Sequence, residues 1–569
     1  MPATSVMTSE QSKVARHRPA PEAHRHRIPP RPPQSAEPAP AAPALALVTT
    51  GAHTGCPLVT AEELGVRVAG SVHCGSGGPA GTGTGPTFAE AVEAFAQADG
   101  VGAIAACVDA IGTDLDGRAL IRAAEAAASA ARPLVVLATG GDRVIDAVLR
   151  QSGVVRVDGF DQLLDCAATL ARFPRPAQRP GPVRIAADSG GAAALLADLA
   201  GRAGLPVEAA DAGADFGAGS GADSGTGADI AELAARPGAG MLLYAVTETG
   251  AAAEWTAAAL VEAARASSTP IGAIWCSSGG TETGYRLILQ RSPEIAAFRT
   301  LTNAVVAAKA YYDHCDFRFR IPALVEDNAM AGVKARQILA SGSGGARKKD
   351  PAAGKGLSES QTHQLLRAYG IRTPREQLVT SAAWAVRAAA TIGYPVVMKA
   401  SVAGLPSASS AGLTRAAITS ASQVRENFKD LMDSAGRQGF GTLDGVLIGQ
   451  QITGGVDTMV GIRRDDRFGP AVVVGVGGAY AETLGDVAIR VAPFDAHQSR
   501  RMLDELHCLP LLTTAGADLE ALADTVLRVQ RMALDLGDVL ETFDIAPLRV
   551  LGRGGGTVAL DASATLIRR

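Results

Sequence analysis

Gly393-Tyr394-Pro395-Val396-Val397-Met398-Lys399 is an apolar strand pattern that ends in a lysine, in a chain of 569 residues that holds only eight lysines. A glycine-rich strand pattern, Val473–Gly478, and the run Asp544-Ile545-Ala546-Pro547-Leu548 follow further along the chain. Burying an unpaired lysine costs several kcal/mol, so the side chain of Lys399 either reaches water or meets an anion such as a phosphate. Spacing alone leaves these two alternatives open.

The composition indicates a soluble globular protein with several domains. The length leaves room for about three to four domains, and 47% of the residues are hydrophobic while 19% are charged. No uninterrupted apolar run approaches the ~20 residues that a bilayer span needs, and the start of the chain is polar and rich in proline. We therefore expect no signal peptide, no membrane anchor and a cytoplasmic protein.

The net charge and the cysteines indicate which classes of protein are less expected. A net charge of -4 predicts no nucleic-acid surface. The seven cysteines are scattered and form no CxxC pair, which favours reduced and mostly buried thiols. Residues 1–43 combine many prolines with arginines and histidines and have almost no aliphatic pattern, so we expect a disordered basic tail there.

From residue 44 onward, strand patterns, glycine-containing loops and helix patterns alternate. The strand patterns lie at 44–48, 66–69, 103–108, 134–137 and 154–157, and then at 183–187, 241–246 and 271–275. Such alternation predicts an α/β fold with parallel, doubly wound sheets. The scheme starts again at residue 183, which looks like an internal duplication.

The last third of the chain begins after a flexible linker. Residues 341–350 are rich in glycine and serine, and a helix with a capping box is predicted to start at 357–361. Helical patterns at 359–369, 382–392 and 519–536 accompany the strand that carries Lys399. A domain boundary is predicted near residue 350.

Taken together, residues 44–566 resemble the ADP-forming acyl-CoA synthetase family, relatives of succinyl-CoA synthetase. Besides the lysine strand, the matching pieces are Leu357-Ser358-Glu359, Leu366-Arg367-Ala368-Tyr369-Gly370-Ile371, Gly454-Gly455-Val456-Asp457, Phe468-Gly469-Pro470, Gly477-Gly478, the segment from Asp486 to Pro493 and the segment from Asp544 to Leu548. The resemblance implies two flavodoxin-like, succinyl-CoA ligase-like domains at 44–175 and 181–320, a hinge and linker at 321–356, and an ATP-grasp domain at 357–569.

In that family an acid and ATP give an acyl phosphate, a loop histidine carries the phosphoryl group, and CoA takes the acyl group. This sequence resembles only part of that relay. Residue 44 already matches the start of the family's second domain, so we expect the CoA-binding domain to be absent. The segment Ala138-Thr139-Gly140-Gly141-Asp142 leads straight into a helix where the histidine loop is expected. Ser407 stands at a second histidine position, and Ala546 replaces an asparagine that helps to hold Mg²⁺ in the family.

The resemblance implies a nucleotide site with ATP and Mg²⁺ as cofactors, and CoA as a further substrate whose binding domain is missing. Mg²⁺ needs hard oxygen ligands, and cations neutralise the phosphates. Asp109 stands at the place of the family's carboxylate that stabilises the phosphohistidine. The predicted residues are Lys399, Arg490 and Asp109 for catalysis, Lys399, Gly477 and Gly478 for the nucleotide, and Glu482, Asp544 and Asp561 for the metal.

Two interpretations remain. In the first, the protein is an ADP-forming ligase in which a small carboxylic acid attacks the γ-phosphate directly, and the acyl phosphate then meets a thiol or an amine, for example on a separate CoA-binding subunit. In the second, the protein is a degenerate relative that binds nucleotide or serves as a scaffold or regulator without catalysis. An amide-forming ATP-grasp ligase is a further alternative. A homo-oligomer is expected because relatives associate through these domains, whereas the identity of the acid and the role of the tail cannot be predicted.

Overall fold

The computed structural model of the chain describes most of the residues after the predicted tail. The described ranges are 43–50, 56–63, 66–74, 85–109, 111, 115–208, 226–276, 284–286, 288, 292–317, 329–341, 356–357, 359–401, 412–438, 445–477 and 485–567. Several predictions lie wholly or largely outside them, namely the tail at 1–43, the linker at 342–350, the helix cap at Ser358, and Ser407, Gly478 and Glu482.

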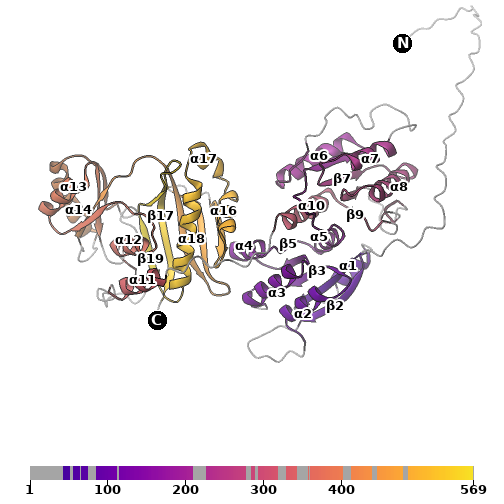
Figure 1. Cartoon of the computed structure of the whole chain (residues 1–569), viewed down its shortest axis with the longest axis horizontal. Helices are drawn as coiled ribbons and strands as arrows, with labels where there is room; N and C mark the ends of the chain where they lie inside the picture. The colour runs from indigo at the N-terminus through magenta and orange to yellow at the C-terminus, as the bar shows by residue number, and fades with distance from the viewer. Residues whose placement is uncertain are drawn as a thin grey trace, which may run out of the picture. The chain divides into compact units, whose positions relative to one another are not determined.

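The first sheet has five parallel strands in the order β2-β1-β3-β4-β5. Their bounds are β1 Ala44–Thr50, β2 Val68–Cys74, β3 Val101–Val108, β4 Leu134–Ala138 and β5 Val155–Val157. Every residue of β1 is buried, as expected for a central parallel strand that is covered on both faces. This strand order is the flavodoxin-like one that the family resemblance implies. Figure 1 labels β2, β3 and β5 of this sheet.

Helices cover both faces of this sheet. One face packs against α2 Phe88–Gln97, α3 Gly117–Ser129 and α4 Arg143–Gln151, and the other against α1 Cys56–Glu63 and α5 Phe160–Arg172. Local sequence explains where two of these helices begin. Thr87 and Glu90 form a capping box at the start of α2, and the Asp142 side chain accepts from two backbone N–H groups at the start of α4.

The second sheet has four parallel strands in the order β6-β7-β8-β9. The bounds are β6 Val183–Ala187, β7 Met241–Val246, β8 Ile271–Trp275 and β9 Ile295–Phe298, with helices α6 Gly190–Arg202, α7 Thr226–Ala235, α8 Ala251–Ala266 and α10 Leu301–Asp316. Val207 makes a single parallel bridge to Val183 on the outer side of β6. The flavodoxin-like order therefore recurs, with its second strand reduced in the described residues to one bridge.

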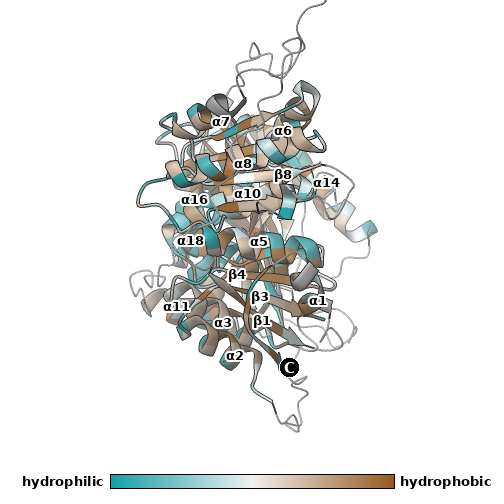
Figure 2. Ribbon diagram, turned by 90° about the vertical axis from the view of Figure 1, so that its right-hand side faces the viewer, coloured by the Kyte–Doolittle hydropathy of each residue, from teal (hydrophilic) through white to brown (hydrophobic). Residues whose placement is uncertain are grey.

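The two parallel sheets share one hydrophobic core. A single cluster of buried side chains joins β1 and β3 of the first sheet to β6 and β7 of the second, through α5 and α10. In α5 the eight consecutive residues from Leu163 to Leu170 are all buried, because this helix has neighbours on every side. Figure 2 shows α10 and α5 between strand β8 of the second sheet and strands β4, β3 and β1 of the first, in keeping with the shared core.

The remaining part forms two lobes. The small lobe is an antiparallel sheet in the order β10-β13-β11-β12, covered by two helices. Its elements are β10 Glu376–Val379, α13 Ala382–Ile392, β11 Val396–Ser401, β12 Thr414–Ile418, α14 Ala421–Arg437 and β13 Gly445–Gln450. The helix predicted at 382–392 is confirmed.

The large lobe is an antiparallel sheet in the order β16-β15-β14-β17-β18, with β19 paired to β17. In the described residues five helices belong to it, and α12 and α18 pack into its core. The bounds are α11 Ala329–Ser341, α12 Glu359–Ala368, β14 Val456–Asp465, β15 Gly469–Val476, β16 Val487–Val491, α16 Ala496–Asp504, α17 Leu509–Thr514, α18 Leu519–Leu536, β17 Leu540–Val550, β18 Thr557–Ala559 and β19 Ala562–Leu566.

Three details differ from the sequence prediction. Lys399 does not end its strand, because β11 continues to Ser401. Asp544 lies in the middle of β17 and not at a strand end, since the strand runs on through the apolar residues that follow. The strand predicted at 66–69 lies later, at Val68–Cys74.

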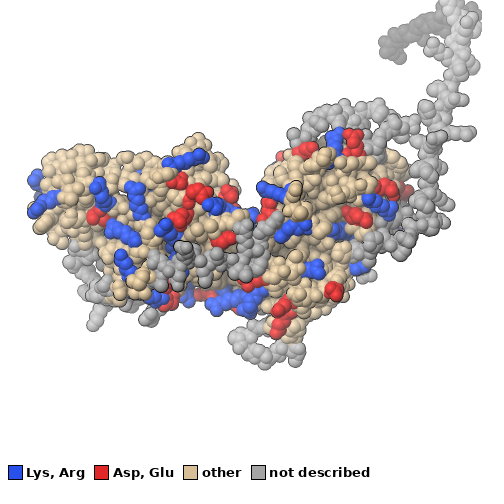
Figure 3. All heavy atoms as spheres, viewed as in Figure 1, with Lys and Arg blue, Asp and Glu red and all other residues tan. Residues whose placement is uncertain are grey.

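Two further expectations concern the whole chain. The six cysteines whose side chains the structure describes are free thiols, and four of them are buried. Within the described ranges, no helix is both long and apolar enough to cross a membrane. Figure 3 shows positive and negative side chains interspersed on the face that it draws.

Candidate nucleotide site

Lys399 lies on β11 and points away from the core of the small lobe. Three alternate residues of the strand, Val396, Met398 and Ala400, belong to that core. Because successive side chains of a strand point to opposite faces, Lys399 lies on the other face. Its side chain is nevertheless only 13% exposed, so the ammonium must be satisfied by the protein.

Residues of the large lobe satisfy it. The Lys399 ammonium donates to Glu359 Oε1 at 2.6 Å and to the carbonyl oxygen of Leu560 at 2.7 Å. Asp561 Oδ1 lies 3.9 Å from the same nitrogen. Glu359 starts α12, and Asp561 lies in the turn between β18 and β19. Lys399 therefore joins the small lobe to two separate elements of the large lobe.

The predicted lysine also has a buried histidine nearby that the sequence analysis missed. His363 is 1% exposed, and its Nδ1 lies 2.8 Å from Glu376 Oε2 while its Nε2 lies 3.9 Å from Glu359 Oε1. Arg367 contacts the other oxygen of Glu376. We call Lys399, Glu359, His363, Arg367, Glu376 and Asp561 the lysine cluster.

The charges of the lysine cluster shift the pKa values of its members. Burial raises the pKa of the Glu359 carboxyl, the Asp561 carboxylate adds to that shift, and the Lys399 ammonium opposes it. Burial alone would lower the pKa of Lys399, but the Glu359 and Asp561 carboxylates outweigh burial and raise that pKa. The two upward shifts therefore have different main causes, burial for the Glu359 carboxyl and nearby carboxylates for the Lys399 ammonium.

Glu376 responds in the opposite direction. Burial would raise the pKa of its carboxyl, but the hydrogen bond to His363 and the positive charge of Arg367 outweigh burial and lower that pKa. The spacing could have pointed to this arrangement, since Glu359, His363 and Arg367 are four residues apart along α12 and share one face of the helix. The sequence analysis used this segment to place a helix and as part of the family resemblance, and assigned no role to its charged side chains.

Asp544 lies on the open face of the large sheet beside an arginine. Its neighbours Phe543 and Ile545 point into the core, so Asp544 points to the other face. Arg463 on the adjacent strand β14 lies 2.7 Å from Asp544 Oδ1, and the two side chains are 43% and 26% exposed. The predicted metal ligand is therefore paired with a cation that the sequence analysis did not consider.

The described residues do not fit a resident Mg²⁺. Asp544 pairs with Arg463, Asp561 faces Lys399, and Ala546 offers no side-chain oxygen. No group of three or more histidine, cysteine, aspartate or glutamate side chains in the described ranges could hold a metal ion. Because Glu482 lies outside those ranges, the predicted set of Glu482, Asp544 and Asp561 stays a prediction.

The predicted glycines adjoin β15. Gly477 follows that strand directly, and its N–H donates to the carbonyl oxygen of Asp457 at 3.1 Å. A Cβ atom at this position would lie 2.5 Å from the carbonyl oxygen of Thr458, so the close approach of two backbones requires glycine here. Gly477 therefore has a packing role, its contact with a nucleotide stays a prediction, and Gly478 lies outside the described residues.

Arg490 is not close to the lysine cluster in the contacts that the structure gives it. It lies on β16 with a side chain that is 1% exposed and pairs with Glu505 through both terminal nitrogens, while its Nε donates to Gln498 at 3.0 Å. Ala488 has the same strand parity and lies in the helix-covered core. Arg490 thus points to the face opposite that of Asp544, and phosphate binding would require it to leave Glu505.

Asp109 is distant from Lys399 in the sequence and directly follows β3 of the first sheet. Its backbone N–H donates to Thr50 Oγ1 at 3.3 Å, at the end of the neighbouring strand β1. In a flavodoxin-like sheet the strand order reverses beside these two strands, where ligands usually bind. The structure does not bring Asp109 together with Lys399 through any contact of the described residues, and its catalytic role stays a prediction.

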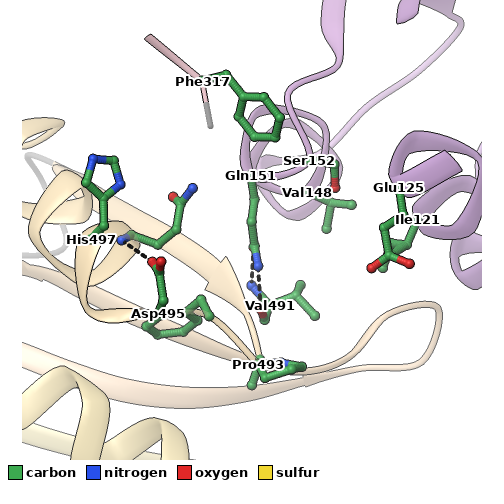
Figure 4. Close-up of a pocket in the computed structure, with 13 residues that line it drawn as sticks. Ile121, Glu125, Val148, Gln151, Ser152, Phe317, Val491, Pro493, Asp495 and His497 are labelled. Atoms are coloured by element: carbon green, nitrogen blue, oxygen red, sulfur yellow. Dashed lines mark hydrogen bonds between the residues drawn. The ribbon is translucent and has the colours of Figure 1, made fainter. Parts of the chain in front are cut away.

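A separate cavity of about 170 Å³ lies between the first sheet's helices and the large lobe (Figure 4). Gln151 of α4 exchanges two hydrogen bonds with the backbone of Val491, at 2.8 and 2.9 Å. Arg150 of the same helix contacts Glu505 at 3.0 Å. None of the predicted site residues lines this cavity, so it marks the contact of α4 with the large lobe and not the candidate site.

Known proteins resemble the lobes that contain the lysine cluster. An ATP-grasp domain family matches residues 350–566. The beta subunit of an ADP-forming acetate–CoA ligase II from Pyrococcus furiosus is 32% identical over 215 residues, which cover 37% of this chain and 91% of that protein. The beta subunit of the corresponding ligase I from the same organism is 33% identical over 238 residues, or 41% of this chain and 98% of that protein.

A longer relative extends the similarity to the parallel sheets. An ADP-forming 4-hydroxybutyrate–CoA ligase from Nitrosopumilus maritimus is 25% identical over 446 residues, which cover 74% of this chain and 62% of that protein. Among solved structures, acetyl-coenzyme A synthetase 1 of Ca. Korarchaeum cryptofilum is 26% identical over 41% of this chain and 100% of its own, with a TM-score of 0.37.

The lobes and the matches define an ATP-grasp protein. More narrowly, the chain belongs to the ADP-forming acyl-CoA synthetase family, as its resemblance to that family implied. It spans about three fifths of the length of the 4-hydroxybutyrate–CoA ligase, 62%.

Proposed function

We propose that this protein is an ATP-dependent, ADP-forming ligase that activates a carboxylic acid as an acyl phosphate. The names of its relatives state ADP formation and acyl-CoA products, which supports this reaction type. In the proposed step, an oxygen of the acid's carboxylate bonds to the γ-phosphorus of ATP. The bond from that phosphorus to the bridging oxygen breaks, and ADP leaves with the electron pair.

The placement of Lys399 is the observation that carries this proposal. It is a lysine held on the inner face of the small lobe, in contact with the large lobe, inside the segment that matches an ATP-grasp domain. A fixed cation at this place neutralises phosphate charge as it shifts during transfer. The phosphate oxygens would accept the hydrogen bonds that the Lys399 ammonium now donates to Glu359 and to the carbonyl oxygen of Leu560.

Magnesium is implied by the family and stays a proposal for this chain. When bound, Mg²⁺ would supply positive charge between the phosphates of ATP. The predicted ligands are Glu482, Asp544 and Asp561, of which the last two face Arg463 and Lys399. The steps proposed here depend on the side chains of the lysine cluster.

The acyl group would pass to a thiol or an amine, with CoA as the first candidate from the relatives' names. The chain between β4 and α4 carries no histidine, and α4 is bonded to the large lobe through Gln151. We therefore propose that a partner subunit supplies the CoA-binding domain and any phosphohistidine, in keeping with the relatives named as beta subunits. We also propose that the chain forms a homo-oligomer.

Calorimetric titration of the full chain with ATP and Mg²⁺ tests the nucleotide site. We expect binding that a Lys399→Met variant loses, because the variant keeps the length of the side chain but not its charge. Lys429→Ala is the matched control, since Lys429 is the only other lysine after residue 355 and is exposed on α14. Equal affinity of the two variants would contradict the proposal.

The chemical step has its own test. Hydroxylamine converts an acyl phosphate into a hydroxamate, so ADP release and hydroxamate formation should appear together when a panel of small carboxylic acids is added with ATP. ADP release that depends on neither the acid nor Lys399 would contradict the ligase function.

A non-catalytic, nucleotide-binding role is the second candidate. The hydrogen bonds of Lys399 to Glu359 and to the carbonyl oxygen of Leu560 favour it, because the ammonium has acceptors in the protein without any ligand. This role predicts that Lys399-dependent binding of ATP occurs without hydroxamate or ADP formation for any acid. Formation of an amide with an added amine, in place of a thioester, would instead identify the amide-forming alternative.

A further inference from the structure

The pair formed by Arg463 and Asp544 lies close to the lysine cluster along β17. The N–H of Ala546 donates to the carbonyl oxygen of Asp561, and the N–H of Leu560 donates to the carbonyl oxygen of Pro547. Lys399 contacts both Leu560 and Asp561. Asp544 and Ala546 are two residues apart on one face of the strand, roughly 7 Å. The cations Lys399 and Arg463 therefore adjoin the same short stretch of β17.

The strands leave space for the Asp544 carboxylate above a glycine. Gly461 of β14 pairs with Asp544 in the register of the sheet. A Cβ atom at Gly461 would lie 2.7 Å from Asp544 Oδ1, so any other residue would push the carboxylate aside. Arg463, two residues further along β14 on the same face, reaches this carboxylate at 2.7 Å.

Arg463 has donors to spare. A guanidinium carries five N–H groups. In the described residues, one terminal nitrogen donates to the carbonyl oxygen of Ile462 at 2.9 Å and the other contacts Asp544. The side chain is 43% exposed, so the remaining N–H groups can reach a ligand on the open face of the sheet. A planar guanidinium is well suited to bind phosphate oxygens in pairs.

A divalent cation on Asp544 would have to compete with this arginine. The charge-assisted contact to Arg463 must break or rearrange before both oxygens of Asp544 are free for a metal. Ala546 presents only a methyl group beside it, and Asp561 faces Lys399. On this stretch of β17 the protein supplies its own positive charge where the family resemblance implies a metal.

We propose that Arg463 is a nucleotide-binding residue that takes the place of a metal ion on Asp544, so that a nucleoside di- or triphosphate binds between Lys399 and Arg463 without a divalent cation. This inference rests on the proposed nucleotide site. It adds that the positive charge that neutralises phosphate at the large lobe comes from Arg463 and not from a metal ion. Arg463 orients and neutralises phosphate, and Asp544 positions Arg463.

Calorimetric titration with ADP, in buffers with Mg²⁺ or with EDTA, tests the inference on the full chain. ADP is used because it binds without turnover. For the unmodified protein we expect dissociation constants within about threefold of each other in the two buffers. For Arg463→Gln we expect binding in EDTA to weaken by about tenfold or more, from the loss of a charge-assisted contact. Binding with Mg²⁺ should weaken less, because Asp544 becomes free for the metal.

The neighbouring arginine is the matched control. Arg464 has the same charge but lies on the opposite face of β14, where it contacts the carbonyl oxygen of Gly537 at 3.1 Å. We expect Arg464→Gln to behave like the unmodified protein in both buffers. The ratio of affinities with and without Mg²⁺ is compared within each variant, so a general loss of folded protein does not mimic the effect. Asp544→Asn removes the charge that a metal ligand needs but keeps an oxygen that can accept from Arg463, so this variant should retain binding in EDTA.

The outcomes separate the two proposals. Binding of ADP to the unmodified protein that disappears in EDTA would overturn the inference and leave the nucleotide site intact. Equal buffer ratios for Arg463→Gln and Arg464→Gln would overturn it as well. No binding of ADP in either buffer would overturn the proposed function and the inference together.

Discussion

Lys399 and Arg490 are two buried cations of the ATP-grasp region, and their surroundings differ. Lys399 lies among three carboxylates and points from the small lobe toward the large one. Arg490 shares the single carboxylate of Glu505 with Arg150 and lies on the helix-covered face of its sheet. Burial of a cation is therefore no guide to ligand binding by itself. The face of the sheet that carries the side chain decides whether a ligand can reach it.

Removal of the Lys399 charge should produce the largest effect on stability. In Lys399→Met the buried carboxylates of Glu359 and Asp561 lose their cation, and breaking a buried ion pair costs about 3–5 kcal/mol. Urea unfolding measures this loss as a lower free energy of unfolding.

A second variant shows whether unpaired charge is the cause. Lys399→Met combined with Glu359→Gln removes one of the stranded carboxylates and should recover part of the loss. If the double variant were less stable than the single one, the cluster would owe its stability to packing and not to charge balance.

Loss of the Arg490 charge should have the next largest effect. Arg490→Gln leaves Glu505 with Arg150, whose side chain is 58% exposed while that of Glu505 is 21% exposed. Because water and Arg150 still stabilise the carboxylate, we expect a loss of about 2 kcal/mol in urea unfolding. Arg150→Gln is the control and should cost no more than about 1 kcal/mol, as exposed pairs do. Equal losses for the two variants would show that burial does not separate them.

The stabilising contributions of Glu505 and of Glu359 should change with pH in opposite directions. Contacts with Arg490 and Arg150 overcome burial and lower the pKa of Glu505, so its stabilising contribution is present above the ordinary glutamate pKa, about 4.3, and is lost as the pH falls. The pKa of Glu359 is raised, so its contribution is greatest at acid pH and declines as the pH rises through the folded-state pKa.

Urea unfolding across this pH range tests the signs. The stability difference between the unmodified protein and Glu505→Gln should shrink on acidification, by about 1 kcal/mol. The difference for Glu359→Gln should grow on acidification. Parallel pH profiles for the two variants would contradict the opposite directions of the two pKa shifts.

Arg463 should contribute least to stability. Its pair with Asp544 is partly exposed, and such pairs contribute about 1 kcal/mol or less. We expect Arg463→Gln to unfold within about 1 kcal/mol of the unmodified protein. A much larger loss would show that Arg463, like Lys399, contributes strongly to the free energy of unfolding.

Periodicity was enough to predict much of the fold. The apolar runs at 183–187, 241–246 and 271–275 coincide with β6, β7 and β8, because buried parallel strands read as continuous apolar segments. The second strand of the second sheet could not be predicted, since it consists of one bridge at Val207 in the described residues. A single pairing leaves no period to detect.

The candidate site was predicted only in part, for physical reasons that particular residues illustrate. Lys399 was recognisable because a charge in an apolar strand is costly. Its partner Glu359 was quoted as part of a helix start and of a family motif but not as a site residue, because a contact across 40 residues of chain has no local signature. Arg490 was predicted as a phosphate ligand from the family resemblance. Because β16 is apolar on both faces, alternation could not reveal which face Arg490 occupies.

The apolar layer shared by α5 and α10 has a consequence for how such a chain can be divided. Each helix packs against its own sheet and also against the other helix, within one continuous core. A gene cut in the connector between residues 173 and 183 would give two products, each with a bare hydrophobic side that invites aggregation. We therefore expect the two parallel sheets to be inherited and recombined as a single unit, independently of the two lobes that follow.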